Sequence, residues 1–102
     1  MISPDSRLQH HPDVAWRLVQ EDALLVDPHT GRIFPLNPVA ARIWTLMDPS
    51  RQVSEIVEIL VNEFDAPHEN VREDAYEFIE KLLSANLVVP APGRVGKGSS
   101  QQ

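Results

Sequence analysis

The residues best suited to chemistry in this chain are its four histidines and the acids near them. The histidines are His10, His11, His29 and His68, and no two of them lie three or four residues apart on a predicted helix. That spacing is the one that places paired histidine ligands on the same side of a helix, where they can bind a metal ion. The sequence therefore predicts no metal site.

Asp27 and His29 lie close together in the sequence and suggest an acid–base pair. Such a pair needs a nucleophile or a bound phosphate to act on, but the chain contains no cysteine, no serine elbow and no glycine-rich phosphate loop. Pro28 supplies a fixed φ and Gly31 suits a positive φ, so residues 27–31 are interpreted as a turn. We expect a protein that is not an enzyme and that needs no cofactor.

Length, charge and cysteine content exclude further classes of protein. The 102 residues suffice for one domain, and the absence of cysteine fits a reducing compartment, so we expect the cytoplasm. The formal net charge of -6 argues against a nucleic-acid partner, because such binding draws on clustered Lys and Arg. No window approaches the roughly 18 apolar residues that cross a bilayer, so no membrane partner is expected.

The elements that position these residues lie between two polar ends. Residues 1–12 show no apolar periodicity, and residues 90–102 are rich in Gly, Pro, Ser and Gln. Such composition is typical of chain ends that do not pack against a core. We expect residues 1–12 to form a flexible arm, residues 90–102 to form a disordered tail, and residues 13–89 to form the domain between them.

Three short strands are expected at the start of this domain. Residues 14–19 place Trp16 and Leu18 on one face and Arg17 and Val19 on the other, and residues 23–26 and 32–36 are short apolar runs bounded by turn signals. The connections between them are short enough for an antiparallel meander. Pro35 has no N–H, so the third strand is expected at an edge of this sheet.

Amphipathic helices follow the strands. The first is predicted to begin with Asn37 as its N-cap and Pro38 at its first position, and to end at Asp48-Pro49. The second runs from about Val53 to Phe64, with apolar residues at helical spacing opposite a charged face.

A third helix completes the predicted order of elements. Asn70 and Glu73 have the spacing of a capping box at its start, and Asn86 is suited to the left-handed conformation at its end. The sequence therefore predicts an α+β fold, with a three-stranded antiparallel meander followed by three helices.

This order of elements resembles the PqqD family, the stand-alone form of the peptide-recognition element of ribosomal peptide modification pathways. The segments that carry the resemblance are Leu36 to Leu46, Ser54 to Val57 with Leu60, Phe64-Asp65, Asp74 to Leu82, and Asn86-Leu87-Val88. Pro35 departs from the family pattern, because it removes a donor from the strand that the family uses for binding.

The resemblance implies a winged-helix-like fold and a non-catalytic peptide chaperone. Its third strand would accept the leader of a precursor peptide as an added strand, and the protein would present that peptide to a modifying enzyme, for this family commonly a radical S-adenosylmethionine enzyme. The peptide-binding positions implied in this sequence are Arg32, Ile33, Phe34, Pro35, Leu36, Asp74, Ala75, Phe78, Ile79 and Leu82. The resemblance leaves open whether the pathway makes coenzyme PQQ or another product.

The physics of an edge strand supports this expectation. An edge strand offers unpaired N–H and C=O groups to any extended peptide, and pockets beside it select among peptides. Strand alternation puts Phe34 and Leu36 on one face and Ile33 and Pro35 on the other. The same edge leaves a homodimer open.

Alternative interpretations apply to the helical positions and to the function as a whole. Phe78, Ile79 and Leu82 are also expected to pack the core. Asp74 also suits a first-turn acid that complements the helix N-terminus. A DNA-binding winged-helix regulator has the same architecture, but the third helix has only two cations, Arg72 and Lys81, among its acids. A purely structural subunit of a larger enzyme complex is the third alternative.

Overall fold

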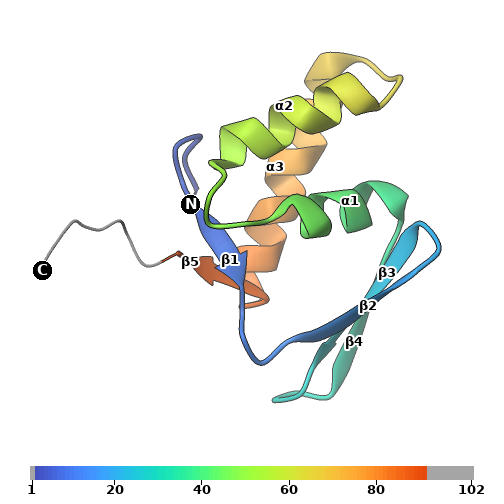
Figure 1. Cartoon of the computed structure of the whole chain (residues 1–102), viewed down its shortest axis with the longest axis vertical. Helices are drawn as coiled ribbons and strands as arrows, with labels where there is room; N and C mark the ends of the chain where they lie inside the picture. Colours follow the sequence, from blue (N-terminus) through green and yellow to red (C-terminus); the bar gives the residue numbers. More distant parts are fainter. Residues whose placement is uncertain (1, 92–102) are drawn as a thin grey trace, which may run out of the picture.

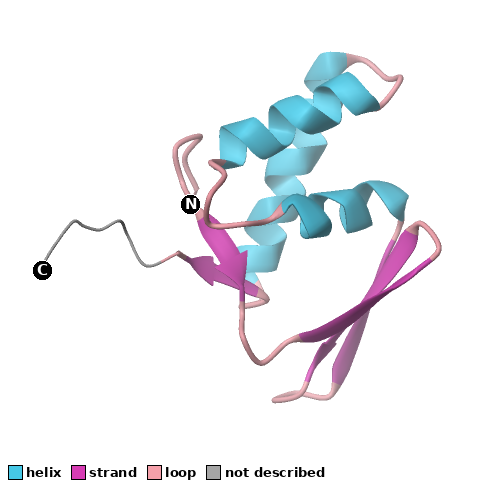
Figure 2. Ribbon diagram, in the orientation of Figure 1, coloured by secondary structure: helices cyan, strands magenta, loops and turns pink. Residues whose placement is uncertain are grey.

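A twisted three-stranded sheet projects from one side of a three-helix unit in the computed structural model, which describes residues 2–91 (Figure 1). The elements, in chain order, are β1 (Leu8–His10), β2 (Ala15–Val19), β3 (Asp22–Asp27), β4 (Arg32–Leu36), α1 (Pro38–Leu46), α2 (Val53–Glu63), α3 (His68–Ser84) and β5 (Val88–Pro90). Strands β2, β3 and β4 form one antiparallel sheet in that order, apart from a two-stranded sheet of β1 and β5 (Figure 2). The predicted α+β fold, a meander followed by three helices, is confirmed.

Two tight turns set the register of the larger sheet. Gln20 and Glu21 connect β2 to β3, and Gln20 adopts a φ of 60°. Between β3 and β4, Gly31 has a φ of 75° and donates its N–H to the Asp27 carbonyl at 2.7 Å. Glycine takes this left-handed conformation at low cost, which is why the predicted turn forms here.

The two ends of the domain pair with each other, which the sequence did not predict. Strand β1 pairs antiparallel with β5, with Gln9 opposite Val89, and Leu8 is buried in the core. The Ser6 carbonyl also accepts the N–H of Val53 at 2.8 Å, so the N-terminal segment satisfies a free donor at the start of α2. The expectation of a flexible arm is therefore wrong for this part of residues 1–12.

Strand β5 also takes in the first residue of the predicted C-terminal tail. Pro90 lies in this strand, and the N–H of Ala91 bonds to the Arg7 carbonyl at 2.9 Å. Both strands have three residues, too few for a periodic pattern, and their pairing joins segments about eighty positions apart in sequence. The rest of the predicted tail, residues 92–102, lies outside the described residues.

The N-terminal ends of α1 and α3 test the two predicted helix caps. The Asn37 Oδ1 accepts the N–H of Ala40 at 2.8 Å, so the predicted cap of α1 is confirmed. Helix α3 begins at His68, directly after Pro67, so the capping box predicted at Asn70 is wrong: that residue already lies in the first turn.

The C-terminal end of α3 follows the prediction. Asn86 has a φ of 62°, and the Leu87 N–H reaches back to the Leu82 carbonyl at 3.0 Å. This left-handed ending satisfies carbonyls that the last helical turn leaves free.

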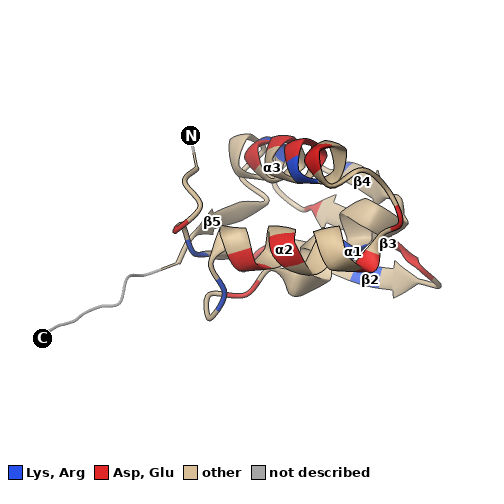
Figure 3. Cartoon of the chain, turned by 90° about the horizontal axis from the view of Figure 1, so that it is seen from above, with Lys and Arg blue, Asp and Glu red and all other residues tan. Residues whose placement is uncertain are grey.

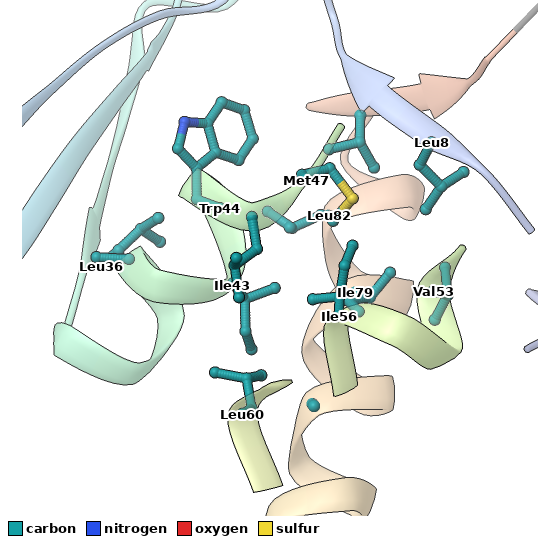
Figure 4. Packing of buried hydrophobic residues seen from close by; sticks show 14 of the residues in the cluster. Leu8, Leu36, Ile43, Trp44, Met47, Val53, Ile56, Leu60, Ile79 and Leu82 are labelled. Carbon is teal, nitrogen blue, oxygen red and sulfur yellow. The ribbon is translucent and has the colours of Figure 1, made fainter. Parts of the chain in front are cut away.

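The core lies between the three helices and the inner face of the sheet. Figure 4 shows side chains from all three helices converging there, among them Ile43 and Trp44, Ile56 and Leu60, and Ile79 and Leu82. The sheet adds three buried side chains from β3 and β4, namely Ala23, Leu25 and Leu36. Strand β2 adds none, because all five of its residues are exposed. The sheet is thus anchored through β3 and β4.

His10 links β1 to the helical unit. Its ring stacks on the buried Trp44 ring, with centroids 3.8 Å apart and an interplanar angle of 2°. The same ring meets the edge of Trp16 at 5.5 Å, and its Nε2 lies 2.8 Å from the Trp44 carbonyl. Burial lowers the pKa of His10 below its usual value, so at neutral pH the uncharged ring donates Nε2–H to that carbonyl.

Candidate functional site

The open edge of β4 is the candidate site. Strand β4 pairs with β3 along one edge, and no strand within residues 2–91 pairs with the other. Figure 3 shows β4 on the same side of the molecule as α3, whereas β2 lies on the side of α1. A peptide that extends the sheet at β4 therefore enters on the side of α3.

The sheet register shows which backbone groups of β4 face this edge. A two-residue hairpin turn closes with a hydrogen-bonded pair, here Val19 and Asp22. Because backbone groups alternate along a strand, Leu24 and Val26 point toward β2, and the residues between them point toward β4.

Across the β3–β4 pairing, Phe34 lies opposite Leu25 and so directs its N–H and C=O to β3. Its neighbours Ile33 and Pro35 direct theirs to the open edge. This assignment agrees with the chemistry of Pro35, whose nitrogen cannot donate to β3 and would break the ladder if it faced that way.

Side chains on β4 divide between two faces as the alternation predicts. Leu36 is buried and Phe34 is half-buried on the inner face, while Ile33 is 62% exposed and Pro35 is exposed on the outer face. The guanidinium carbon of Arg32 lies 5.0 Å from the centroid of the Phe34 ring. This cation–π distance holds an aromatic ring and a cation together on the inner face of the edge strand.

The five predicted positions on α3 separate into core and surface residues. Ala75, Ile79 and Leu82 are buried in the core, so they have no surface to offer a peptide and instead hold the helix in place. Asp74 is exposed and Phe78 is half-buried. Only the latter two remain candidates for direct contact.

The orientation of α3 is set by its contact with α2. The Arg72 Nη2 bonds to the Glu58 Oε2 at 2.8 Å, which directs the Arg72 flank of α3 toward α2. Val71, Asp74 and Phe78 follow one another at three- and four-residue spacing and share the opposite flank. Phe78 and Asp74 therefore face away from α2.

The exposed surface of α3 is acidic. Figure 3 shows acidic residues along the length of this helix. They are Glu69, Glu73, Asp74, Glu77 and Glu80, against the two cations Arg72 and Lys81. A negative helix repels nucleic-acid phosphate and attracts cationic peptide side chains.

The sequence interpretation missed an uncovered apolar surface on the outer face of the sheet. Leu24 and Val26 of β3 lie there beside Ile33, and each is more than a third exposed. The signal was present in the run Ala23-Leu24-Leu25-Val26, which is apolar at every position, whereas a strand with one solvated face alternates.

A shallow cavity of about 350 Å³ lies away from the β4 edge, beside the turn between β2 and β3. Leu18, Ala41 and Phe64 contribute apolar walls. At its rim, Arg42 forms two hydrogen bonds with Glu63, from Nε at 2.9 Å and from Nη2 at 2.6 Å. Hydrogen bonding to Arg42 lowers the pKa of Glu63, so this pair is charged at neutral pH.

The histidine and acid side chains do not gather into a larger site. His29 Nε2 lies 2.8 Å from the Asp13 Oδ2, on the molecular surface. Among residues 2–91, no three His, Asp or Glu side chains come together in a way that would hold a metal ion. None of the three helices described combines the length and the apolar character needed to span a bilayer.

Comparison with known proteins gives matches to one family and to solved structures. The model of the family described as coenzyme PQQ synthesis protein D (PqqD) matches residues 22–88, from the start of β3 to the start of β5. No curated protein matches the chain.

Two solved structures are similar to this chain. The structure of TbiB1 in complex with the TbiA(beta) leader peptide shares 25% sequence identity, covers 78% of this chain and 93% of that chain, and has a TM-score of 0.70. Lasso peptide synthetase B1 complexed with the leader peptide shares 16% identity, covers 83% of this chain and 100% of that chain, and has a TM-score of 0.72. At 16% identity, the similarity to lasso peptide synthetase B1 shows a shared fold alone.

Proposed function

The chain belongs to the PqqD family, and from that premise we propose that it is a non-catalytic adaptor for a ribosomally made precursor peptide. The leader of the precursor adds as a strand to the open edge of β4, and the adaptor presents the rest of the peptide to a modifying enzyme. The observation that carries this proposal is the unpaired edge of β4 beside the half-buried Phe34. A leader peptide is also the ligand named for both similar structures.

Backbone pairing gives the site affinity for extended peptides in general. Each hydrogen bond made at the edge contributes about 0.5–1.5 kcal/mol net. A peptide must be ordered to bind, at a cost that backbone pairing alone does not offset. Apolar side chains must therefore supply the remainder.

Phe34 on β4 and Phe78 on α3 supply the apolar contacts in this proposal. Both are half-buried, so each has ring surface left to cover. A leader side chain fully buried against such rings gains about 1.5–3 kcal/mol. Two or three of them gain about 3–9 kcal/mol, which, before ordering costs are subtracted, is comparable to the roughly 8.2 kcal/mol that corresponds to a dissociation constant of 1 μM.

Charge adds selectivity among leaders. Arg32 stands over Phe34 at one side of the proposed site, and Asp74 lies exposed on α3 at the other. A leader with an acid near Arg32 and a base near Asp74 fits this arrangement, because complementary charges favour correct registers and speed association.

Presentation to an enzyme follows from tethering. A peptide held by its leader and an enzyme held by the adaptor meet at an effective concentration set by the connecting segment. We place a radical S-adenosylmethionine enzyme first among the partners, as membership of the PqqD family suggests. A homodimer stays a prediction that sedimentation tests.

Nuclear magnetic resonance tests the proposed site directly. Uniformly ¹⁵N-labelled protein is titrated with synthetic TbiA(beta) leader and with leader segments of precursor peptides encoded beside this gene. Strand addition predicts amide shifts concentrated in residues 31–36 and on the Phe78 flank of α3, with little change around Arg42. Shifts spread evenly over the molecule, or confined to the Arg42 side, would contradict the proposal. A duplex DNA titration serves as the negative control.

A further inference from the structure

The open edge of β4 offers different hydrogen-bonding groups at its two outward-facing residues, Ile33 and Pro35. Ile33 offers both an N–H and a C=O to a visiting strand, because its backbone groups point away from β3. Pro35 offers only its C=O, because its ring nitrogen carries no hydrogen. A peptide therefore finds one position with two hydrogen-bonding groups and, two residues on, a position with an acceptor alone.

We propose that the open edge of β4 restricts where a bound peptide can carry proline, and that Pro35 lowers the affinity of this edge by leaving one peptide carbonyl unpaired. This inference rests on the proposed function, because it concerns how a peptide adds to β4. The whole of the described sheet is antiparallel, so the peptide is taken to run antiparallel to β4.

In that orientation three consecutive peptide residues oppose Ile33, Phe34 and Pro35, and the residue opposite Pro35 lies two positions nearer the peptide N-terminus. The residue opposite Ile33 must both donate and accept. The residue opposite Pro35 must donate its N–H to the Pro35 carbonyl, while its own C=O finds no donor on β4.

The central residue, opposite Phe34, behaves differently. Its N–H and C=O point away from β4, because the N–H and C=O of Phe34 are hydrogen-bonded to β3. A proline at this central position removes no bond to the protein, whereas a proline at either neighbour removes one. The site is thus expected to accept proline at the central position and to exclude it from the two flanking positions.

Side chains give one register a preference over a slip by one residue. The central peptide side chain lies on the inner face with Phe34, whose ring is capped by Arg32. The flanking side chains lie on the outer face, where Ile33 is 62% exposed and stands beside Val26. A slip by one residue would exchange these two sets of side chains between the faces of the sheet. The ligand class is an extended peptide with an apolar or proline centre and an apolar residue opposite Ile33.

Pro35→Ala tests the inference, with Pro28→Ala as the matched control. The first variant restores an N–H at the open edge, while the second removes the same ring from the exposed turn between β3 and β4. Affinity is measured by isothermal titration calorimetry with the leader that binds most tightly in the titrations above. One added hydrogen bond predicts binding about 2- to 10-fold tighter for Pro35→Ala, with Pro28→Ala unchanged.

A scan of the peptide provides the second measurement. Nuclear Overhauser contacts between the α-hydrogen of Phe34 and the peptide identify the central residue, because non-hydrogen-bonded pairs bring their α-carbons to about 4.5 Å. N-methylation at the central residue is expected to change affinity less than about 2-fold, and N-methylation at either neighbour to weaken it by about 2- to 10-fold or more.

The outcomes separate this inference from the function on which it rests. If a leader perturbs residues 31–36 but Pro35→Ala binds no more tightly, or N-methylation weakens binding most at the central residue, the proposed rule is overturned and strand addition stands. If no leader perturbs this strand, the proposed function falls and the rule falls with it.

Discussion

Replacing Ile33 with proline is the sharpest test of strand addition, because it acts on the backbone of the open edge. The N–H of Ile33 points away from β3, so its removal leaves the β3–β4 ladder intact. Leu18→Pro is the matched control. Leu18 is next to Val19, which forms the hydrogen-bonded pair with Asp22, so by alternation the Leu18 N–H also points to a free edge. Ile33 and Leu18 are similarly exposed, at 62% and 51%.

The expected loss of affinity comes from the peptide carbonyl that the Ile33 N–H would have met. A hydrogen bond contributes about 0.5–1.5 kcal/mol net, but an acceptor left unsatisfied behind the proline ring at a partly buried site costs about 1–3 kcal/mol. The second value already includes the lost bond, so the predicted loss is about 1–3 kcal/mol, which is at least about 5-fold in the dissociation constant.

Isothermal titration calorimetry with the selected leader measures this loss, and circular dichroism melts establish that both variants are folded. Ile33→Pro should weaken binding at least about 5-fold while Leu18→Pro binds as the unmodified protein does. The reasoning is refuted if a folded Ile33→Pro variant keeps full affinity. It is refuted equally if Leu18→Pro loses as much, since the peptide would then not distinguish β4 from β2.

Three further predictions concern stability. Ile79→Ala should lower the free energy of unfolding by about 2–5 kcal/mol in urea titrations, because it leaves a cavity among the three helices; a loss under 1 kcal/mol would contradict its place in the core. Asn37→Ala should cost about 1 kcal/mol through loss of the α1 cap, whereas Asn37→Asp should keep most of the stability. Because burial lowers the pKa of His10, the unfolded chain binds its proton more readily, so unfolding should become easier as the pH falls from about 6.5. Urea titrations at pH 7 and 5.5 should show a smaller difference for His10→Gln, and an equal difference would count against the buried ring as its source.

Local signals were enough to predict much of the fold. Asn37 and Pro38 start α1, and Gly31 closes the hairpin before β4, because each residue satisfies a need set by its immediate neighbours. Pro35 fixed the edge position of β4 for the same reason, since its missing N–H acts wherever the strand lies.

Contacts between segments far apart in the sequence could not be predicted from local signals. Nothing in Leu8 to His10 indicates that Val88 to Pro90 will pair with it, because each partner supplies the other's hydrogen bonds only after folding. On α3, apolar periodicity identified Phe78 and Ile79 together, but the angle at which the helix packs decides that Ile79 is buried and Phe78 half-exposed. That angle depends on apolar partners on the other helices, such as Ile43 on α1 and Leu60 on α2, which the sequence of α3 does not contain.

The pairing of β1 with β5 brings the two entry points of the domain together. The Ala91 N–H bonds to the Arg7 carbonyl at 2.9 Å, so the residue before β1 and the residue after β5 are joined by one hydrogen bond. A unit closed in this way can be inserted into a surface loop of a host polypeptide without stretching it, and a short linker between these residues would permit circular permutation. Grafting residues 4–91, which keeps the Pro4 and Ser6 carbonyls bonded to the start of α2, should therefore transfer the open edge of β4 to another scaffold.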